Sequence, residues 1–501
     1  MGGTMTRRLT RTPMGFLGHG GGMWSRVPQA PMWFSTSVQG CGIYPFGVGT
    51  GRPTDGAPLG RDVDTHTAVC TDHEALYRAN VISSPTGILF GINGVGKSTT
   101  AQTILLGQMG RGLTPAVFDP IKGEHVPMIR AVGGQVFSIG PGAGRDKLNI
   151  VSPGPLGAAA ARIGGHVGEE LAQLARDKAV ALVQLNARVS RGHPLDDIED
   201  TALEAIVDSL RERTSRPVTR DLVTVFDAVS DRMLHVTGQR DADSFRARFA
   251  RLGETLRSMI SGEMGQMLSG VDSVEFDPGN PGGFCFDTSS IDPSNTRLLS
   301  AAMLSTWSLG MDAIDAHWEI AQHEQRLVEE AALAGEMYVP KVTWSGYTSL
   351  MDECWYPLRA CEGIVDRYDA LIRTNRSKGV AELKVTHSPK DLISLPNPAD
   401  REKARGFVER SGLVYLMALT RDDLESLSGI RRLTSKEINR VASFNAAPSW
   451  KQPPRRKGEK GAPPGAGRVM LKLPERAGIT VQMFQTDVQQ QLHVTDERYR
   501  Q

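Results

Sequence analysis

A glycine-rich loop near residue 90 constrains the fold of this chain more than any other feature. Residues 91–98 read Gly-Ile-Asn-Gly-Val-Gly-Lys-Ser, which completes the pattern G-x-x-x-x-G-K-[ST], and they follow the apolar run 87–90. Glycines let the backbone turn so that successive N–H groups converge on phosphate oxygens, and the following helix offers its positive N-terminus to the same anion. The pattern therefore predicts a strand, a phosphate-binding loop and a helix, in that order.

The motif assigns a role to each residue type in the loop. Lys97 is expected to reach the β- and γ-phosphates of a nucleotide, and Ser98 to supply a hydroxyl ligand for Mg²⁺. A glycine-rich turn that matches by chance is the alternative, and the helical pattern of residues 99–106 argues against it. The residues predicted to bind the nucleotide are Gly91, Asn93, Gly94, Val95, Gly96, Lys97, Ser98 and Thr99.

The composition excludes several classes of protein. The chain has 57 basic and 56 acidic residues, so no global field draws it to nucleic acid or to an anionic membrane. Its five cysteines are scattered, which suits a reducing compartment, and they lack the spacing of a zinc site. No apolar run reaches the roughly 18 residues of a membrane span, and no signal core follows the N-terminal arginines. We therefore expect a cytoplasmic protein without zinc.

Changes in composition along the 501 residues predict six segments. The first is rich in Gly, Pro, Met and Arg and is expected to be a low-complexity tail. The middle of the chain changes to helical periodicity, which predicts an all-helical insertion within an α/β core. The segments are a tail (1–58), a first part of the core (59–158), the insertion (159–270), a second part of the core (271–448), a Pro/Gly/basic linker (449–466) and a C-terminal strand and tail (467–501).

Several elements are expected on either side of the insertion. Strands are predicted at 113–119, 135–139 and 283–287, and a long helix at 296–334. Inside the insertion, a capping box at Thr201 and Glu204 and a single helix from Phe245 to Met259 are predicted.

A second nucleotide motif follows the long helix. Residues 347–353 are predicted to form a strand that ends in Asp352 and Glu353, the Walker B arrangement. Asp352 is predicted to hold Mg²⁺ through water, and Glu353 to orient and polarise the attacking water. The metal neutralises phosphate charge, so the neighbouring carboxylate is free to act as a base.

Nine segments of the chain together resemble one family, the ATPases of type IV secretion and conjugal DNA transfer, which includes TraC, TrbE and CagE. Residues 352–355, Asp-Glu-Cys-Trp, are similar to its D-E-A-W signature, and residues 386–392 to its T-Q-S-x-x-D-L segment. The resemblance extends over about residues 58 to 490. The segments are 60–62, 76–85, 118–124, 132–135, 148–149, 352–355, 373–379, 386–392 and 467–472.

The resemblance implies a fold, a function and further site residues. The fold is a RecA-like P-loop NTPase of the HerA/FtsK type, and the function is an ATP- and Mg²⁺-dependent motor that drives conjugative transfer or channel and pilus assembly.

Arg376 resembles an arginine finger aimed at the nucleotide of an adjacent subunit, which implies a homo-hexamer. The alternative is an arginine on the protein surface with no catalytic role. His387 stands where the family offers a glutamine to sense the γ-phosphate. Partners are expected among secretion components at the inner face of the membrane, where contact would be peripheral.

The chain departs from the family pattern in two respects. His387 can still donate a hydrogen bond through a ring nitrogen, but its reach and its charge differ from those of glutamine, so turnover is expected to be slow or conditional. Only about 90 residues precede the loop, so the large N-terminal domain of the family is expected to be missing, truncated or encoded elsewhere.

Two other functions remain open at the level of the sequence. The first is an FtsK- or HerA-like DNA translocase or coupling protein, and the basic segment 453–460 is its only local support. The second is a scaffold that binds ATP with little turnover. Retention of Lys97, Ser98, Asp352 and Glu353 argues against the scaffold, because a protein without turnover has no need for the base.

Overall fold

The computed structural model describes residues 11–12, 15–16, 52–271, 274–359, 365, 375–393, 395, 397–445, 465 and 467–492. The chain divides into two compact units, 1–51 and 52–501. In the first, β1 (Arg11–Thr12) and β2 (Gly15–Phe16) form an antiparallel hairpin. Most of the predicted tail and the linker 449–466, apart from residue 465, lie outside the described residues.

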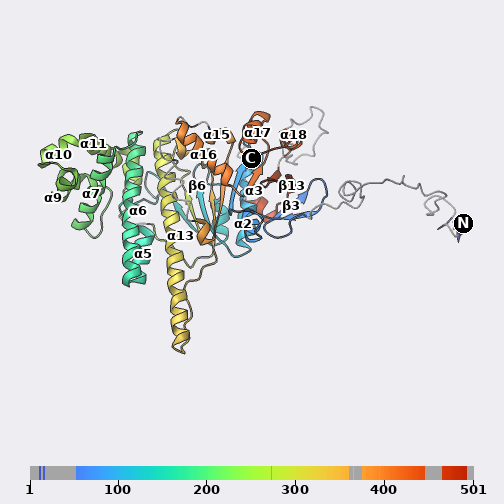
Figure 1. Cartoon of the computed structure of the whole chain (residues 1–501), viewed down its shortest axis with the longest axis horizontal. Helices are drawn as coiled ribbons and strands as arrows, with labels where there is room; N and C mark the ends of the chain where they lie inside the picture. Colours follow the sequence, from blue (N-terminus) through green and yellow to red (C-terminus); the bar gives the residue numbers. More distant parts are fainter. Residues whose placement is uncertain are drawn as a thin grey trace. The chain divides into compact units, whose positions relative to one another are not determined.

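An 11-stranded sheet organises the second unit (Figure 1). Its strand order is β4-β3-β13-β12-β11-β5-β10-β9-β6-β8-β7; the strands from β11 to β7 run parallel, and β12, β13, β3 and β4 extend the sheet antiparallel. The strands are β3 (Pro58–Asp62), β4 (Ala68–Cys70), β5 (Thr86–Phe90), β6 (Thr114–Asp119), β7 (Gln135–Ser138), β8 (Phe284–Asp287), β9 (Tyr347–Met351), β10 (Val380–Thr386), β11 (Leu413–Leu416), β12 (Arg468–Lys472) and β13 (Ile479–Met483).

The central strands are buried on both faces, as parallel strands covered by helices must be, and the buried Glu382 and Lys384 of β10 pair with each other. All residues of β6, β8, β9, β10 and β11 are buried. The strands predicted at 113–119, 135–139 and 283–287, and the Walker B strand, are confirmed to within a residue or two. The antiparallel strands β3, β4 and β13 were not predicted.

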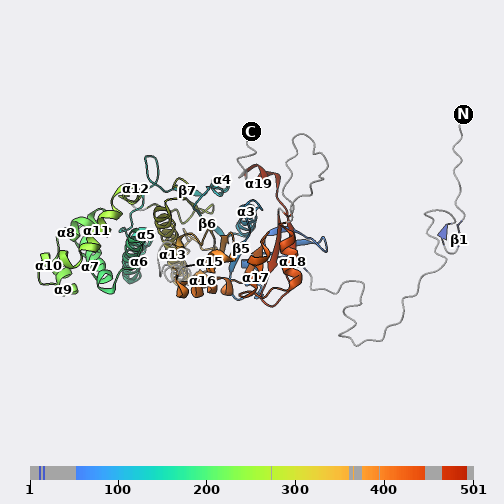
Figure 2. The ribbon, with the colours of Figure 1, turned by 90° about the horizontal axis from the view of Figure 1, so that it is seen from above.

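Helices cover the sheet and form a separate layer at one end of it (Figures 1 and 2). They are α2 (His73–Arg78), α3 (Lys97–Met109), α4 (Val126–Ala131), α5 (Gly154–Ile163), α6 (Gly165–Arg191), α7 (Asp197–Arg213), α8 (Asp221–Asp227), α9 (Asp231–Thr237), α10 (Ala242–Arg248), α11 (Ala250–Met259), α12 (Gly262–Met267), α13 (Thr296–Leu333), α15 (Pro389–Ile393), α16 (Pro398–Arg410), α17 (Arg421–Ser428), α18 (Ser435–Ser443) and α19 (Asp487–Leu492), with 3-10 turns η1 (Pro357–Arg359) and η2 (Asn375–Lys378).

The long helix α13 connects the sheet to the helical layer. It contacts β6 on one side and α5 and α6 on the other, and both views show α7 to α11 beyond α6 (Figures 1 and 2). Helices α5 to α12 lie between β7 and β8 in the chain. No helix among the described residues is both long enough and apolar enough to cross a membrane.

Two predictions inside the helical layer are wrong. The capping box of α7 lies at Asp196 and Glu199, where the Asp196 carboxylate accepts the Glu199 N–H at 2.7 Å, whereas Thr201 sits inside the helix. The single helix predicted from Phe245 to Met259 is divided at Phe249, which leaves helical geometry (ψ 23°) and is fully buried against Phe245, 4.8 Å away between ring centroids. The break falls where these two rings pack.

The contact between α13 and the sheet predicts the effect of a small substitution. A Cβ added at Gly310 would lie 2.6 Å from two ring atoms of Phe118 and 3.2 Å from Phe284. We therefore expect Gly310→Ala to lower the free energy of unfolding by about 1–3 kcal/mol, because overpacking outweighs the helical preference for alanine. Gly406→Ala in α16 is the control, since its Cβ would meet only the flexible end of Arg410 at 3.3 Å. Unfolding midpoints followed by circular dichroism test this; equal midpoints for the two variants would contradict it.

Candidate nucleotide site

Three adjacent parallel strands bring the two predicted motifs to one edge of the sheet. Strand β10 lies between β5, which precedes the loop, and β9, which precedes the acidic pair. In the register, Thr386 of β10 pairs with Phe90 of β5, and Lys384 pairs with Met351 of β9. The carboxyl ends of all three strands therefore meet, and His387 follows β10 and contacts Lys97 of the loop and Glu353 of the acidic pair. This is the edge at which open α/β sheets bind ligands.

The glycine-rich loop has the backbone geometry of an anion cradle. Gly94 and Gly96 adopt positive φ angles of 80° and 96°, a region that favours glycine. A Cβ built on Gly94 would meet no described atom within 4 Å, so the space beside the loop is open. The Gly91 N–H donates to the His387 carbonyl at 3.2 Å, and the Ile92 N–H to the Ala418 carbonyl at 3.0 Å. The loop residues thus fit a bound phosphate chain.

Lys97 lies at the start of α3, in contact with the end of β10. Its Nζ is 2.8 Å from His387 Nδ1, 3.3 Å from the Ile92 carbonyl and 3.4 Å from Asn93 Oδ1. Burial lowers the pKa of Lys97, although the attraction of Glu353 and Asp352 opposes this. An ammonium group can only donate, so Nδ1 of His387 must accept from a charged Lys97.

Glu353 completes a chain of polar contacts that starts at Lys97. Its Oε1 lies 2.8 Å from His387 Nε2, and its Oε2 accepts the Trp355 indole N–H at 2.7 Å. Since Nδ1 of His387 accepts from Lys97, Nε2 carries the proton and donates to Glu353. Glu353 also has a positive φ of 47°, which strains a residue with a side chain. Lys97, His387 and Glu353 therefore form one connected polar chain.

Asp352 lies beside a buried histidine that the sequence analysis did not single out. The His125 side chain is fully buried, its Nε2 is 3.6 Å from Asp352 Oδ2, and neither ring nitrogen makes a hydrogen bond to a described residue. Burial would lower the pKa of His125, but Asp352 and Asp119 outweigh it and raise the pKa. Burial would raise the pKa of Asp352, but His125 and Lys97 lower it. Asp352 is thus held as a carboxylate.

Asp119 is the third acid at this edge, at the end of β6. It is 2 % exposed and accepts the His125 N–H at 2.7 Å, and burial raises its pKa to about 6. Asp119 is the last residue of the strand predicted at 113–119. The sequence offered no signal for His125, because only the turn after β6 brings that ring to Asp352.

The other residues predicted to bind nucleotide lie in the loop or in the first turn of α3, whereas Arg376 lies elsewhere in the chain. Val95 is 7 % exposed, and Ser98 and Thr99 are half-buried in the first turn of α3. The backbone of Arg376 lies in η2, but its side chain is outside the described residues. Ser98 and Asp352 are the oxygen donors that could hold Mg²⁺, a hard cation that prefers oxygen ligands.

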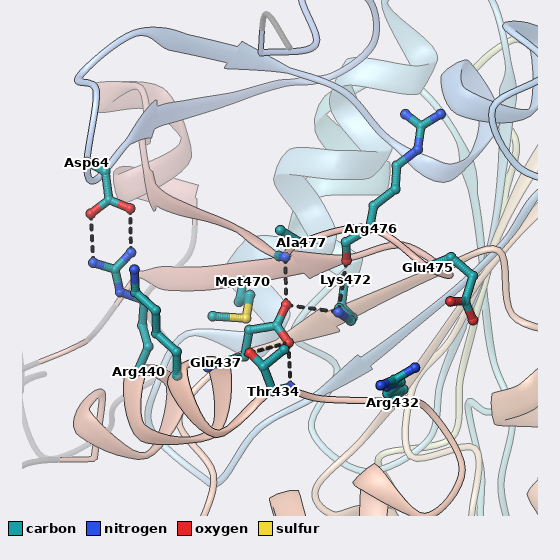
Figure 3. Close-up of a pocket in the computed structure, with 12 residues that line it drawn as sticks. Asp64, Arg432, Thr434, Glu437, Arg440, Met470, Lys472, Glu475, Arg476 and Ala477 are labelled. Carbon is teal, nitrogen blue, oxygen red and sulfur yellow. Dashed lines mark hydrogen bonds and ion pairs between the residues drawn. The ribbon is translucent and has the colours of Figure 1, made fainter. Parts of the chain in front are cut away.

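A second cavity, of about 400 Å³, lies away from this edge, beside α18 and β12 (Figure 3). Its charged groups mainly bond one another: Glu437 accepts from Lys472 at 2.9 Å, and Arg440 pairs with Asp64 through both terminal nitrogens. The side chains of Arg432 and Arg476 point in different directions in Figure 3, so they do not converge on one position. We therefore place the candidate site at the loop.

Comparisons with known proteins find similarity in structure only. No family model and no curated protein matches the chain. VirB4 of Thermoanaerobacter pseudethanolicus is similar, with a TM-score of 0.59 and 14% identity over 88% of this chain and 100% of that chain. The bacterial conjugative coupling protein TrwBΔN70 has a TM-score of 0.47 and 13% identity over 86% of this chain and 94% of its own. At this identity, the likeness to VirB4 shows the fold alone, and the predicted α/β fold is confirmed.

The positive φ at Glu353 predicts an unusual order of stabilities. Glu353→Gly and Glu353→Ala both lose the carboxylate, but only alanine keeps a Cβ in the left-handed region. We expect Glu353→Gly to be the more stable by about 1 kcal/mol in the free energy of unfolding. Glu329, exposed in α13, is the control, because alanine should be more stable there by up to about 1 kcal/mol. Denaturant unfolding tests this, and the same sign at both positions would contradict it.

Proposed function

We propose that this chain is the ATP-hydrolysing motor of a type IV secretion or conjugative DNA transfer system. The observation that carries the proposal is the convergence of Lys97 and Glu353 on His387, each 2.8 Å from one ring nitrogen. Three motifs far apart in the sequence thereby meet in one polar chain beside an open glycine cradle. A fold with no catalytic use would not require a buried lysine and a strained glutamate at the same edge.

The residues of the site divide the work of hydrolysis. The N–H groups of residues 93–97, with the Lys97 ammonium, would bind the phosphates, and Ser98 and Asp352 would hold Mg²⁺. The metal, when bound, supplies positive charge that offsets the charge of the phosphates. Glu353 would take the proton of the attacking water, because its carboxylate is held at a fixed point and carries no metal.

Nucleotide binding would change the hydrogen-bond partners of His387. In the structure, Lys97 donates to Nδ1 of His387. A phosphate chain in the loop would compete for the Lys97 ammonium, since charge-assisted hydrogen bonds to phosphate are strong. Nδ1 of His387 would then lose its donor, and it could donate to the terminal phosphate only after taking up a proton, while Nε2–H keeps its bond to Glu353. Binding and the position of the base would thus be connected through one side chain.

The place of this motor in a secretion system is supported by two observations. The segments that resemble the family extend over most of the second unit, and the likeness to VirB4 covers 88% of the chain. Arg376 lies in η2, directly before β10 in the sequence, and would act as a finger on a neighbouring subunit. We therefore propose a ring, with a homo-hexamer as the expected size, that works with other secretion components at the inner face of the membrane.

The proposal predicts a clear separation between two variants. Lys97→Ala should abolish ATP binding, because the loop loses its only lysine ligand for the phosphates. Glu353→Gln should keep ATP binding within a few-fold and lower turnover by about 10²–10⁴, because the base is lost. Calorimetric binding and steady-state hydrolysis measure the two effects. Equal hydrolysis by the parent and both variants would refute the site assignment.

The same assay separates the motor from the DNA translocase. A secretion motor should hydrolyse ATP without DNA, whereas a translocase should show DNA-stimulated hydrolysis and DNA binding that weakens steeply with salt. Mass measurement with ATP bound tests the ring. Tight binding without turnover would favour the scaffold.

His387 permits a further prediction because both ring nitrogens have partners. A glutamine can accept through its carbonyl oxygen and donate through its amide, so His387→Gln should keep turnover within about tenfold. His387→Leu offers neither function and should lower kcat by about 10²-fold. Steady-state hydrolysis by both variants tests this. A leucine variant as active as the glutamine variant would show that the polar contacts of His387 are not used.

A further inference from the structure

A stacked pair of side chains connects the ends of β9 and β10. The Trp355 ring, whose N–H donates to Glu353, lies under the guanidinium of Arg359 at 4.4 Å from the ring centroid. Arg359 Nη2 in turn lies 3.3 Å from Oδ1 of Asp391, in α15. These contacts run from the acidic pair at the end of β9 to the helix that follows β10.

Asp391 fixes the turn that presents His387. Its second oxygen, Oδ2, accepts the Ser388 N–H at 3.0 Å and the Thr386 hydroxyl at 3.4 Å, so one carboxylate holds the residues on both sides of His387. The His387 carbonyl is held separately by the Gly91 N–H at 3.2 Å. The backbone of His387 is therefore fixed before its ring makes any contact.

The contacts close into a circuit. From Glu353 they pass through Trp355, Arg359 and Asp391 to the turn at His387, whose Nε2 returns to Glu353 at 2.8 Å. We propose that Trp355, Arg359 and Asp391 are positioning residues that hold the Glu353 carboxylate and the His387 ring in a fixed relation during ATP hydrolysis. This inference rests on the proposed function, and it adds residues that act through Glu353 and His387 without touching nucleotide.

Burial and exposure support a role in geometry over one in stability. The Arg359 side chain is 42% exposed and that of Asp391 is 20% exposed, and ion pairs this open to solvent contribute little to folding. The circuit nevertheless constrains a glutamate whose backbone is strained at φ 47°. Strained residues persist only where their surroundings determine the conformation, and here Trp355 and His387 each bond one carboxylate oxygen.

The kinetics of ATP hydrolysis by two single variants, Trp355→Phe and Asp391→Asn, and by the double variant test the circuit. Trp355→Phe keeps a ring for Arg359 but loses the N–H, and Asp391→Asn keeps the size but loses an acceptor and the charge. Each variant should lower kcat by about tenfold, which is less than the roughly 100-fold loss that a small displacement of a catalytic group can cause. The affinity of each variant for ATP should stay within about twofold of that of the parent. The double variant should lose about as much as the worse single variant, because residues that act as a unit are not additive.

Tyr356→Phe is the matched control, because Tyr356 follows Trp355 in the chain but is not part of the circuit. The variant loses only the hydroxyl that donates to the Pro293 carbonyl. It should keep the kcat of the parent. The inference would be overturned by unchanged kcat in Trp355→Phe and Asp391→Asn, or by fully multiplicative losses in the double variant. It would also be overturned if the losses followed a fall in thermal stability and appeared equally in Tyr356→Phe.

A spectroscopic measurement separates failure of the circuit from failure of the proposed function. In ¹⁵N-histidine NMR, the His387 signals are identified by their loss in His387→Gln. The parent and Tyr356→Phe should show the Nε2–H tautomer, and Trp355→Phe and Asp391→Asn a mixture of tautomers. A parent that hydrolyses no ATP would refute the proposed function, and the tautomers would then decide the circuit alone: a mixture only in the circuit variants supports it, and unchanged tautomers overturn it.

Discussion

The parallel register of β5, β10 and β9 is the constraint on which the site depends. Because β10 lies between the other two strands, the residue after its last position faces both the loop and the acidic pair. A shift of one residue would turn every side chain of β10 to the opposite face of the sheet. The single ring of His387 can touch Lys97 and Glu353, both at 2.8 Å, only while this register holds.

Burial of these charges makes the arrangement demanding. An unpaired charge in a buried site is strongly unfavourable, so each ionisable group here requires a partner. Asp352 has His125 and Lys97 near it, and burial raises the pKa of Asp119 to about 6, which lowers the amount of negative charge at the edge in weakly acidic solution. A bound Mg²⁺ and phosphate chain would provide further partners, which is one reason to expect the site to be more stable with nucleotide.

The helical layer is tied to the same region through α13. Lys178 of α6 contacts Asp312 at 2.6 Å and Asp315 at 2.7 Å, and Lys378 of η2 contacts Asp315 at 2.5 Å. Helix α6, helix α13 and the turn that carries the Arg376 backbone therefore share one partly buried group of charges. If the helical layer moved relative to the sheet, these ion pairs would break or η2 would move with the layer. The helical layer and η2 are therefore mechanically connected.

The sequence by itself determined the loop, the acidic pair and the parallel strands β5, β6, β7, β8 and β9, because each depends on residue types over a few consecutive positions. Glycine spacing predicts the turn at Gly94 and Gly96, and continuous apolar runs predict buried strands. Only the tertiary structure decided strands β3, β4, β11 and β13, the break at Phe249, the place of His125 beside Asp352, and the contact of Arg359 with Asp391. These features join residues distant in the chain, and their physical cause is packing and strand order, which local propensity does not encode.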